Sequence, residues 1–506
     1  MQDYIKRILA ARVYDVAVET PLDPMLRLSQ RAENAILLKR EDLQPVYSFK
    51  IRGAYNKIAN LPQEAKQKGI ICASAGNHAQ GVALSARHLG IVSTIVMPTT
   101  TPDIKVEAVK SFGGNAVLHG NGFDEAYAYA RKLEQERGLT FIHPYDDPDV
   151  IAGQGTIAME ILRQHSSPID AVFVQIGGGG LAAGMAAYIK FLHPEIKVIG
   201  VEPDDAASMT ASLKAGHIVE LEQVGLFADG VAVRRVGDET FAMCQELLDD
   251  TVTVSGDEIC AAVKDIFDDT RASAEPSGAV SLAGLKKYAA RERLSGQTLI
   301  AVNSGANLNF DRLRYISERA EIGERREALI AVTIPETPGA YLNFIQEIGN
   351  RSVTEFNYRY ASDSAAQIFV GIQLRGGDAE KEQIIENLQN KGYRVTDMTD
   401  NEMAKLHVRY MVGGRVTGLE NELVYRFQFP ERPGALLNFL KGMAQGWNIS
   451  LFHYRNHGAE YGRILAGIQV PPEERDSFEA FLHKLGYPWW DENDNPAYRL
   501  FLDADC

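Results

Sequence analysis

Residues 171–190 read AVFVQIGGGGLAAGMAAYIK, and this stretch indicates the fold class of the chain. An apolar run from Ala171 to Ile176 is followed by four consecutive glycines and then by small apolar residues. No charge falls between Asp170 and Lys190, as in a membrane span, but Gln175 and the glycines interrupt the apolar run. We therefore predict a buried strand, a glycine loop and a helix, which together form one unit of an α/β sheet.

The same alternation of short β-rich runs and longer helical patterns surrounds this stretch, and it predicts a mostly parallel sheet covered on both faces. The predicted strands are Ile70–Ser74, Ser93–Met97, Asn115–Leu118, Ala171–Ile176, Lys197–Val201 and Thr298–Val302. Helical patterns occupy residues 258–271 and 277–288. The α/β region ends near Ala320, and the charged segment EIGERR at 321–326 predicts a linker.

The remainder of the chain contains an internal repeat. PETPGAYLNFI and PERPGALLNFL begin 95 residues apart, and two further pairs of segments begin 96 residues apart. The six segments start at Pro335 and Pro430, Phe356 and Phe452, and Ile368 and Ile464. Each copy predicts strand, Pro-Gly turn, helix, strand, strand, helix and strand, which is a ferredoxin-like α+β module. We expect modules at 327–399 and 421–495, and their place after an α/β region favours regulation over chemistry.

The amino-acid composition of the chain limits the kinds of molecule that it is expected to bind. The chain has 506 residues with 52 Lys plus Arg and 67 Asp plus Glu, giving a net charge of −15. This sign disfavours binding to nucleic acid or to an anionic membrane, so we expect small molecules and copies of this chain as partners. The cysteines form no CxxC pair, and the N-terminus lacks the apolar core of a signal peptide. Both features predict a cytoplasmic protein.

Two segments near the N-terminus carry candidate functional residues. Lys50 lies in SFKIRGA before a predicted helix at 53–60, where a desolvated amine would be a Schiff-base candidate. The alternative is a solvated lysine at a helix start. SAGNHAQG at 74–81 follows a strand and opens a helix, so it suits an anion or polar ligand. Alternatively, Ser74 caps the helix, Asn77 completes the turn and His78 is a structural histidine.

Two further segments lie at the ends of predicted strands. GGGGLAAG, which begins at Gly177, lets the backbone approach a phosphate at a helix N-terminus. With Glu202 as a ribose-binding acid it also resembles the fingerprint of an NAD-dependent dehydrogenase, and a glycine turn without ligand is the third reading. NSGAN at 303–307 ends a strand and precedes another predicted helix, so Ser304 either hydrogen-bonds a ring or caps that helix.

Taken together and in this order, SFKIRGA, SAGNHAQG, GGGGL and NSGAN resemble the pyridoxal-phosphate enzymes of the tryptophan-synthase-β fold type (fold type II). Within that group they resemble the threonine deaminases, also called threonine ammonia-lyases, over about residues 15–320. The resemblance implies a catalytic domain at 1–320 made of two open, mostly parallel α/β subdomains. It also implies that the chain dehydrates and deaminates L-threonine to 2-oxobutanoate and ammonia, with L-serine as a second candidate substrate.

The resemblance further assigns roles to individual residues. Lys50 would form the internal aldimine with pyridoxal phosphate and act as the base, and Ser74 would lie near the substrate carboxylate. Phe49 would lie against the cofactor ring, Asn77 near its phenolic oxygen and Ser304 at its pyridine nitrogen. The phosphate would be held by Gly177, Gly178, Gly179, Gly180 and Leu181. Related racemases bind a divalent cation at a segment similar to VEPDDAAS, but Ser208 replaces an acidic position here, so we expect no metal.

The repeated modules resemble the paired ACT-like domains of the biosynthetic, isoleucine-controlled enzyme. This implies feedback by isoleucine, with valine as a second candidate effector, and a homotetramer. Candidate effector positions are Gly339 and Gly434 in the Pro-Gly turns, and Tyr358 and Tyr454 on the following strands; turn geometry and sheet packing are the alternative explanation. The competing hypotheses are threonine synthase or a serine-preferring dehydratase, an NAD-dependent dehydrogenase, and a non-catalytic amino-acid sensor.

Overall fold

The computed structural model describes residues 2–335, 340–349, 351–358, 365–410, 420–430, 447–455 and 461–502. The chain divides into two compact units, Met1–Ala320 and Glu321–Cys506. Among the described residues, no helix has the length and apolarity needed to cross a membrane.

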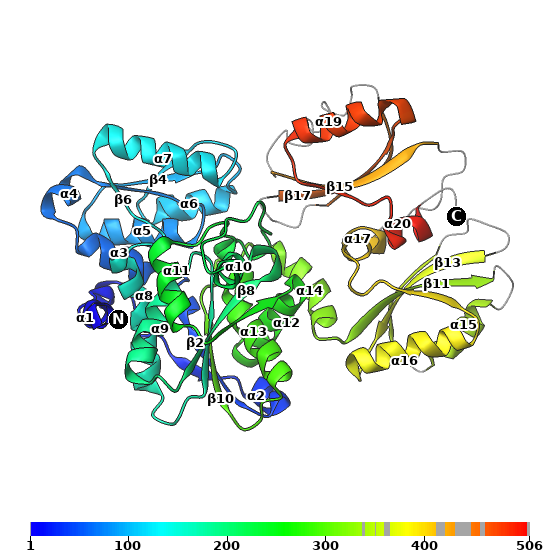
Figure 1. The fold of residues 1–506 in the computed structure, drawn as a ribbon, viewed down its shortest axis with the longest axis horizontal. Helices are drawn as coiled ribbons and strands as arrows, with labels where there is room; N and C mark the ends of the chain where they lie inside the picture. The colour runs from blue at the N-terminus through cyan, green and yellow to red at the C-terminus, as the bar shows by residue number, and fades with distance from the viewer. Residues whose placement is uncertain are drawn as a thin grey trace. The chain divides into compact units, whose positions relative to one another are not determined.

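The first unit contains a larger, six-stranded sheet with the strand order β1-β2-β10-β7-β8-β9. All neighbouring strands are parallel except for the β1 and β2 pair. The strands are β1 (Leu22–Pro24), β2 (Ala35–Arg40), β10 (Thr298–Asn303), β7 (Ala171–Gln175), β8 (Lys197–Pro203) and β9 (Asp250–Val254). This sheet lies in the green part of the ribbon in Figure 1, together with the dark blue β2.

A smaller, four-stranded parallel sheet forms the second part of this unit, with the order β5-β4-β3-β6. Its strands are β5 (Asn115–Leu118), β4 (Ser93–Met97), β3 (Ile70–Ala73) and β6 (Thr140–Phe141). Successive side chains of β3 point to opposite faces: Ile70 and Cys72 join one core cluster, and Ile71 and Ala73 join another. Both faces of this strand are therefore buried, which explains its continuous apolar sequence.

Helices cover both sheets. Those of the first unit are α1 (Gln2–Leu9), α2 (Leu26–Ala32), α3 (Lys50–Ala59), α4 (Gln63–Lys68), α5 (Asn77–Leu89), α6 (Asp103–Ser111), α7 (Phe123–Arg137), α8 (Pro148–Gln164), α9 (Gly180–Leu192), α10 (Ser208–Ala215), α11 (Asp238–Leu247), α12 (Gly256–Thr270), α13 (Pro276–Glu292) and α14 (Arg312–Gly323). Short 3₁₀ turns are η1 (Val13–Asp15), η2 (Glu41–Leu43), η3 (Asp204–Ala206) and η4 (Asp229–Val231). In the larger part, α9 and α13 lie on either side of the sheet (Figure 1).

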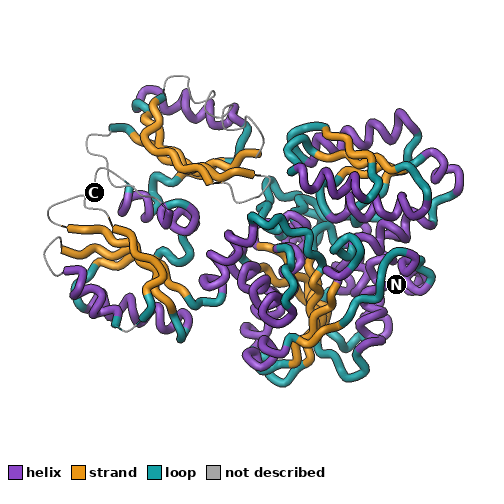
Figure 2. The backbone as a smooth tube through the Cα atoms, turned by 180° about the vertical axis from the view of Figure 1, so that it is seen from behind, coloured by secondary structure: helices purple, strands orange, loops and turns teal. Residues whose placement is uncertain are grey.

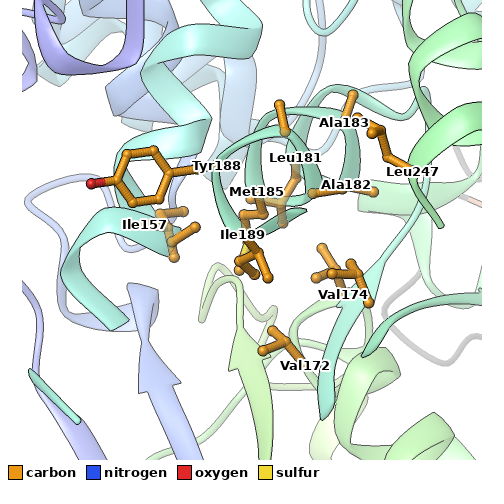
Figure 3. Packing of buried hydrophobic residues seen from close by; sticks show 14 of the residues in the cluster. Ile157, Val172, Val174, Leu181, Ala182, Ala183, Met185, Tyr188, Ile189 and Leu247 are labelled. Atoms are coloured by element: carbon orange, nitrogen blue, oxygen red, sulfur yellow. The ribbon is translucent and has the colours of Figure 1, made fainter. Parts of the chain in front are cut away.

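The stretch from Ala171 to Lys190 folds as predicted into β7, a glycine loop and α9. Figure 3 shows side chains of α9, among them Met185 and Ile189, facing Val172 and Val174 of β7. These residues are fully buried, so the absence of charge reflects a protein core covered on both faces. The core fixes the axis of α9, and with it the glycine loop that precedes the helix.

The second unit contains two modules with the same topology, visible as two separate groups of orange strands in Figure 2. The first module comprises β11 (Glu327–Pro335), α15 (Ala340–Ile348), β12 (Val353–Tyr358), β13 (Ala365–Gln373), α16 (Gly377–Asn390) and β14 (Arg394–Asp397). The second comprises β15 (Glu422–Pro430), β16 (Asn448–Arg455), β17 (Tyr461–Gln469), η6 (Pro472–Glu474), α19 (Arg475–Leu485) and β18 (Trp489–Asp491). Their antiparallel sheets run β12-β13-β11-β14 and β16-β17-β15-β18, which confirms the duplicated ferredoxin-like module.

Three short elements complete this unit: α17 (Glu402–Leu406), η5 (Val408–Tyr410) and α20 (Pro496–Phe501). A shared apolar cluster joins the two modules through Leu329 and Phe369 of the first sheet and Val424 and Leu465 of the second. Met403 of α17 belongs to the same cluster. The two repeats therefore share a core. The fold class predicted from the sequence is confirmed in both units.

Three predicted boundaries are wrong. The helix expected at 53–60 begins at Lys50 instead. The segment expected as a linker at 321–326 is helical up to Gly323, because α14 continues into it. NSGAN is not followed directly by a helix, since α14 starts at Arg312. In the second repeat, the first predicted helix falls at 431–446, outside the described residues.

Candidate active site

Lys50 is the first residue of α3, and its side chain reaches the backbone of a distant segment. Its Nζ donates a hydrogen bond to the carbonyl oxygen of Pro144 at 3.1 Å. Burial lowers the pKa of Lys50 to about 8, partly opposed by the negative charge of Glu275. Above this pH the amine is neutral, which is the form that attacks an aldehyde.

The residues before Lys50 attach its loop to the end of β10. The backbone N–H of Phe49 donates to the carbonyl of Ser304 at 3.1 Å, and Ser48 forms an isolated bridge with Gly305. The ring of Phe49 is buried, with its centroid 5.2 Å from the Lys50 amine. The Lys50 and Ser304 segments, separated by some 250 residues of sequence, are therefore one local structure.

A buried ionic network supports the other side of α3. Arg52 is fully buried and contacts Glu41 at 2.7 Å and Glu160 at 2.6 Å. Lys39 contacts Glu160 at 2.6 Å. Two positive and two negative charges thus balance one another away from water, and removing any one of them would leave an uncompensated buried charge. This network holds the first turn of α3, and Lys50 with it.

The SAGNHAQG segment connects β3 to α5. Ser74 is not a helix cap as one reading expected, because α5 begins at Asn77 after Gly76; its Oγ instead accepts from the N–H of Gly76 at 3.2 Å. His78 is buried, its Nε2 lies 2.9 Å from the carbonyl oxygen of Ile142, and burial lowers its pKa to about 3. His78 therefore stays neutral near pH 7, as a structural histidine does.

The glycine loop is shaped by its close neighbours. A Cβ at Gly178 would lie 2.1 Å from the ring of Tyr145, and one at Gly180 would lie 2.8 Å from the Tyr145 carbonyl oxygen. Gly179 has a φ of +98° and would bring a Cβ to 2.8 Å from Thr240. The Thr240 hydroxyl donates to the Gly178 carbonyl at 2.7 Å. Only glycine fits these positions, and the loop is held from α11 as well as from β7.

This loop exposes backbone donors at the start of α9. The first bond along the helix runs from the N–H of Ala183 to the carbonyl of Gly179 at 2.9 Å. The N–H groups of Gly180, Leu181 and Ala182 precede it, so they have no partner within the helix. They lie at the positive end of the helix dipole, where an anionic group such as a phosphate is favoured.

Tyr145 belongs to a segment that links this loop to Lys50. The preceding residue, Pro144, is the acceptor for the Lys50 amine, and Tyr145 packs on Gly178. The next residue, Asp146, accepts from three backbone N–H groups at the start of α11, at 3.0 to 3.2 Å. Sequence reasoning missed this segment because it contains no glycine pattern, and its acidic run reads as a solvated turn.

Ser304 is buried at the end of β10. Its hydroxyl lies 3.5 Å from the carbonyl oxygen of Ser277, at the start of α13. Since no helix begins at Ser304, its predicted capping role is wrong, and the alternative role as a partner for a ring remains.

Glu202 does not behave as a ribose-binding acid. It is fully buried, and its two carboxylate oxygens accept from the N–H groups of Met209 and Thr210 at 2.8 and 2.7 Å. Burial raises its pKa to about 7. Glu202 is used to cap α10, which weakens the dehydrogenase hypothesis. No group of three or more His, Cys, Asp or Glu with metal-binding geometry is found among the described residues.

Two charged residues join the smaller and larger parts of the first unit near the site. Lys105 of α6 contacts Asp229 of η4 at 2.9 Å, and Arg312 of α14 contacts the same carboxylate at 3.4 Å. These two cations lower the pKa of Asp229 against the effect of burial. The N–H of Gly230 donates to Ser277 at 2.8 Å, beside the Ser304 loop. No sequence motif indicates this ion pair.

The candidate effector residues are only partly described. Gly339 and Gly434 lie outside the described residues. Tyr358 and Tyr454 end or nearly end the equivalent strands β12 and β16, where they pair with Ile368 and Ile464. The equivalence inferred from the repeat is therefore present in the backbone.

The chemical groups of the site fit an aldehyde cofactor that carries a phosphate. Lys50 supplies an amine of lowered pKa, and the glycine loop supplies anion-binding N–H groups that a Cβ at Gly178 or Gly180 would obstruct. Phe49 supplies an apolar ring beside the amine. Contacts through Pro144, Tyr145 and Ser304 join these groups into one site.

Comparison with known families gives two matches. Residues 13–305, more than half of the chain, match the family described as pyridoxal-phosphate dependent enzyme. Residues 318–408 and 413–502 each match the C-terminal regulatory domain of threonine dehydratase. The two regulatory matches coincide with the two modules of the second unit.

Comparison with individual proteins points the same way. L-threonine dehydratase biosynthetic IlvA of Burkholderia multivorans is 58% identical over 503 residues, which cover 99% of each chain. The Escherichia coli K12 protein of that name is 57% identical over 99% of this chain and 97% of its own. The processed form of threonine deaminase isoform 2 from Solanum lycopersicum has a TM-score of 0.62 and 52% identity, covering 63% of this chain and 92% of that one.

Proposed function

Because this chain belongs to the biosynthetic threonine dehydratases, a family of pyridoxal-phosphate-dependent enzymes, we propose that it converts L-threonine to 2-oxobutanoate and ammonia by the residues described here. The observation that carries this proposal is the buried Lys50 amine, joined to the glycine loop through Pro144 and Tyr145. When bound, the cofactor supplies an electron-accepting ring that makes the Cα–H of the amino acid acidic.

We assign the cofactor contacts residue by residue. Lys50 anchors the aldehyde carbon and Phe49 lies against the ring. Asn77 contacts the phenolic oxygen and Ser304 the pyridine nitrogen. The phosphate is held by Gly177, Gly178, Gly179, Gly180 and Leu181. A neutral hydroxyl at Ser304 does not hold the ring nitrogen protonated, which favours prompt loss of the β-hydroxyl over transamination.

Lys50 and Ser74 are the proposed catalytic residues. With its pKa lowered to about 8, the Lys50 amine would be able to take the Cα proton of the bound amino acid near neutral pH. Ser74, at the turn before α5, holds the substrate carboxylate. L-serine carries the same leaving hydroxyl, so we propose it as a second substrate.

We assign regulation to the second unit. Isoleucine is the proposed inhibitor and valine a competing effector, bound near Gly339, Tyr358, Gly434 and Tyr454. The reaction would be the first step of isoleucine biosynthesis in the cytoplasm, carried out by a homotetramer. The two matches to a threonine dehydratase regulatory domain support a regulatory role for this unit.

The proposal is tested by recording the visible spectrum of the purified protein before and after L-threonine, and by assaying 2-oxo acid with and without isoleucine. We expect a yellow protein whose band shifts on addition of threonine, and oxo acid whose formation isoleucine suppresses. A protein that stays colourless after added pyridoxal phosphate would refute the cofactor assignment.

Replacing Lys50 by Ala should remove both the anchored cofactor band and the base. We expect oxo acid formation to fall by about 10³-fold or more, since a general base contributes roughly 10²–10⁴-fold. The control is Lys68→Ala, because Lys68 is an exposed residue paired with Glu64. A Lys50→Ala protein with full activity would contradict the assignment.

A further inference from the structure

Glu275 is a buried carboxylate that none of the sequence motifs includes. It stands at the N-cap position of α13, yet in the described structure its side chain does not cap that helix. Its Oε1 instead accepts a hydrogen bond from Asn77 Nδ2 at 2.6 Å, across 198 residues of sequence. An acid at this position ordinarily bonds the free N–H groups of its own helix, so the carboxylate is directed to another partner.

The hydrogen-bond chain that ends at Glu275 fixes the orientation of Asn77. Asn307 Nδ2 donates to the carbonyl oxygen of Val46 at 2.8 Å, which can only accept. The same nitrogen donates to Asn77 Oδ1 at 2.6 Å. Asn77 must therefore present its Nδ2 to Glu275, which accepts. This uses one of the two Nδ2 hydrogens and leaves the other available to a ligand.

Glu275 also packs against the loop that carries Ser304. Its backbone N–H donates to the carbonyl of Gly305 at 3.1 Å. A Cβ at Gly305 would lie 2.4 Å from Glu275 Oε1, so the carboxylate fills the space that a side chain would need. One residue thus contacts both Asn77, from the smaller part of the unit, and the Ser304 loop, from the larger part.

We infer that Glu275 is a positioning residue that holds the Asn77 amide in one orientation for the cofactor and keeps it in register with the Ser304 loop. The inference rests on the proposed function, in which Asn77 contacts the phenolic oxygen of the cofactor and Ser304 its pyridine nitrogen. What Glu275 provides is a hydrogen-bond acceptor at a fixed place. Glutamine, which offers a carbonyl oxygen there, should substitute for it, and alanine should not.

The test titrates the full-length apo protein with pyridoxal phosphate and measures its dissociation constant and the wavelength of the bound band. We expect Glu275→Ala to weaken binding by about tenfold, as expected for loss of one hydrogen bond to a charged acceptor. Glu275→Gln should stay within about threefold of the unchanged protein. The matched control is Glu292→Gln at the other, exposed end of α13.

A double-variant cycle separates positioning from a general loss of structure. Asn77→Ala should weaken binding and shift the band as Glu275→Ala does, and adding Glu275→Ala to Asn77→Ala should weaken binding by less than about twofold more. Asn307→Ala breaks the other end of the hydrogen-bond chain and should shift the cofactor band in the same direction as Glu275→Ala does. It also provides the test if Glu275→Ala does not fold.

Three outcomes would overturn the inference. The first is that Glu275→Ala or Asn307→Ala binds the cofactor with unchanged affinity and an unchanged absorption band. The second is that the effects of Glu275→Ala and Asn77→Ala on affinity are fully additive, and the third is that Glu275→Gln binds the cofactor as weakly as Glu275→Ala. Failure of the proposed function is distinguishable, because then the unchanged protein would itself form no Lys50-dependent band. If that band forms and the Glu275 variants leave it unaltered, only the positioning role is refuted.

Discussion

At the scale of single residues, the pKa of Lys50 sets the pH at which the site captures an aldehyde. Burial lowers it to about 8, so the amine is protonated below this pH and neutral above it. Capture of pyridoxal phosphate by the apo protein should therefore accelerate as pH rises through about 8. The rate at which the absorption band of the bound cofactor forms, measured between about pH 6 and 10, tests this prediction. A midpoint of the rate profile near the ordinary lysine pKa of about 10.4 would contradict it.

The titratable residues near Lys50 determine how the pH dependence of cofactor capture is interpreted. His78 is buried and His143 is partly buried, and desolvation lowers their pKa values to about 3 and about 4, so both stay neutral throughout. Burial and the nearby Asp229 raise the pKa of Glu275 to about 7, and above that pH its charge raises the pKa of Lys50. Glu275→Gln should therefore move the midpoint of capture downward, whereas the exposed Glu292→Gln should leave it in place.

Gly178 offers a second prediction at this scale. Its missing side chain is replaced by the ring of Tyr145, which a Cβ would meet at 2.1 Å. Gly178→Ala must move either the ring or the loop, so we expect cofactor affinity to fall by about tenfold or more and stability by roughly 1–3 kcal/mol. Cofactor titration and thermal unfolding measure the two effects. Gly122→Ala, where nothing lies within 4 Å of the new Cβ, is the control for cofactor affinity and should leave it unchanged.

The sequence allowed some of these residues to be predicted. Lys50 and the four glycines stand in motifs whose spacing follows from local chain geometry, so they are recognisable from sequence. Glu275 reads as an ordinary acid before a helix, and its partner Asn77 lies 198 residues away. Tyr145 belongs to no recognisable sequence motif. Contacts made across the fold leave no local trace, and such residues become visible only once the strands are assembled.

At the scale of elements, α6 and η4 are joined by the contact of Lys105 with Asp229. This contact holds the part of the unit that carries Asn77 against the part that carries the Ser304 loop. Lys105→Met should raise the KM for threonine by about tenfold with a smaller effect on kcat, because a partly buried ion pair is lost while Lys50 is untouched. Steady-state kinetics check this.

The control for that change lies on the same helix. Lys110 is exposed and pairs only locally with Glu107, so Lys110→Met should leave the KM unaltered. Equal effects of the two substitutions would show that charge on α6, rather than the bridge to η4, matters. A fall in kcat alone would also contradict the role assigned to the bridge.

Element types were predictable, but several ends were not. Strands such as Ser93–Met97 and Asn115–Leu118 agree with the prediction to the residue, because both ends are marked by turn residues. The helix predicted at 53–60 starts three residues later than α3, which begins at Lys50 and includes the buried Arg52. In the structure, the charges of Glu41 and Glu160 balance Arg52 inside the core. These ion pairs are tertiary contacts, so the local sequence pattern does not show that Arg52 is buried.

At the scale of the whole molecule, the duplication was clear from sequence because both copies retain matching segments at a nearly constant offset. The structure adds that each copy carries the same internal contact: Glu327 accepts from Thr354, and Glu422 accepts from Ser450. Both hydroxyls lie where the register of the second strand shifts. The equivalence extends to details of sheet geometry, which supports treating the modules as two versions of one regulatory fold.

The proposed feedback by isoleucine would have to act in both directions. If isoleucine bound to the second unit weakens threonine binding at Lys50, then threonine must weaken isoleucine binding by the same factor. A coupling of about 1–3 kcal/mol corresponds to a change of roughly 5–150-fold. Isothermal titration of isoleucine into the holoenzyme, with and without a non-reactive threonine analogue, should therefore give different affinities. Equal affinities in a protein whose threonine KM responds to isoleucine would show that the effector acts on a catalytic step and leaves substrate binding unchanged.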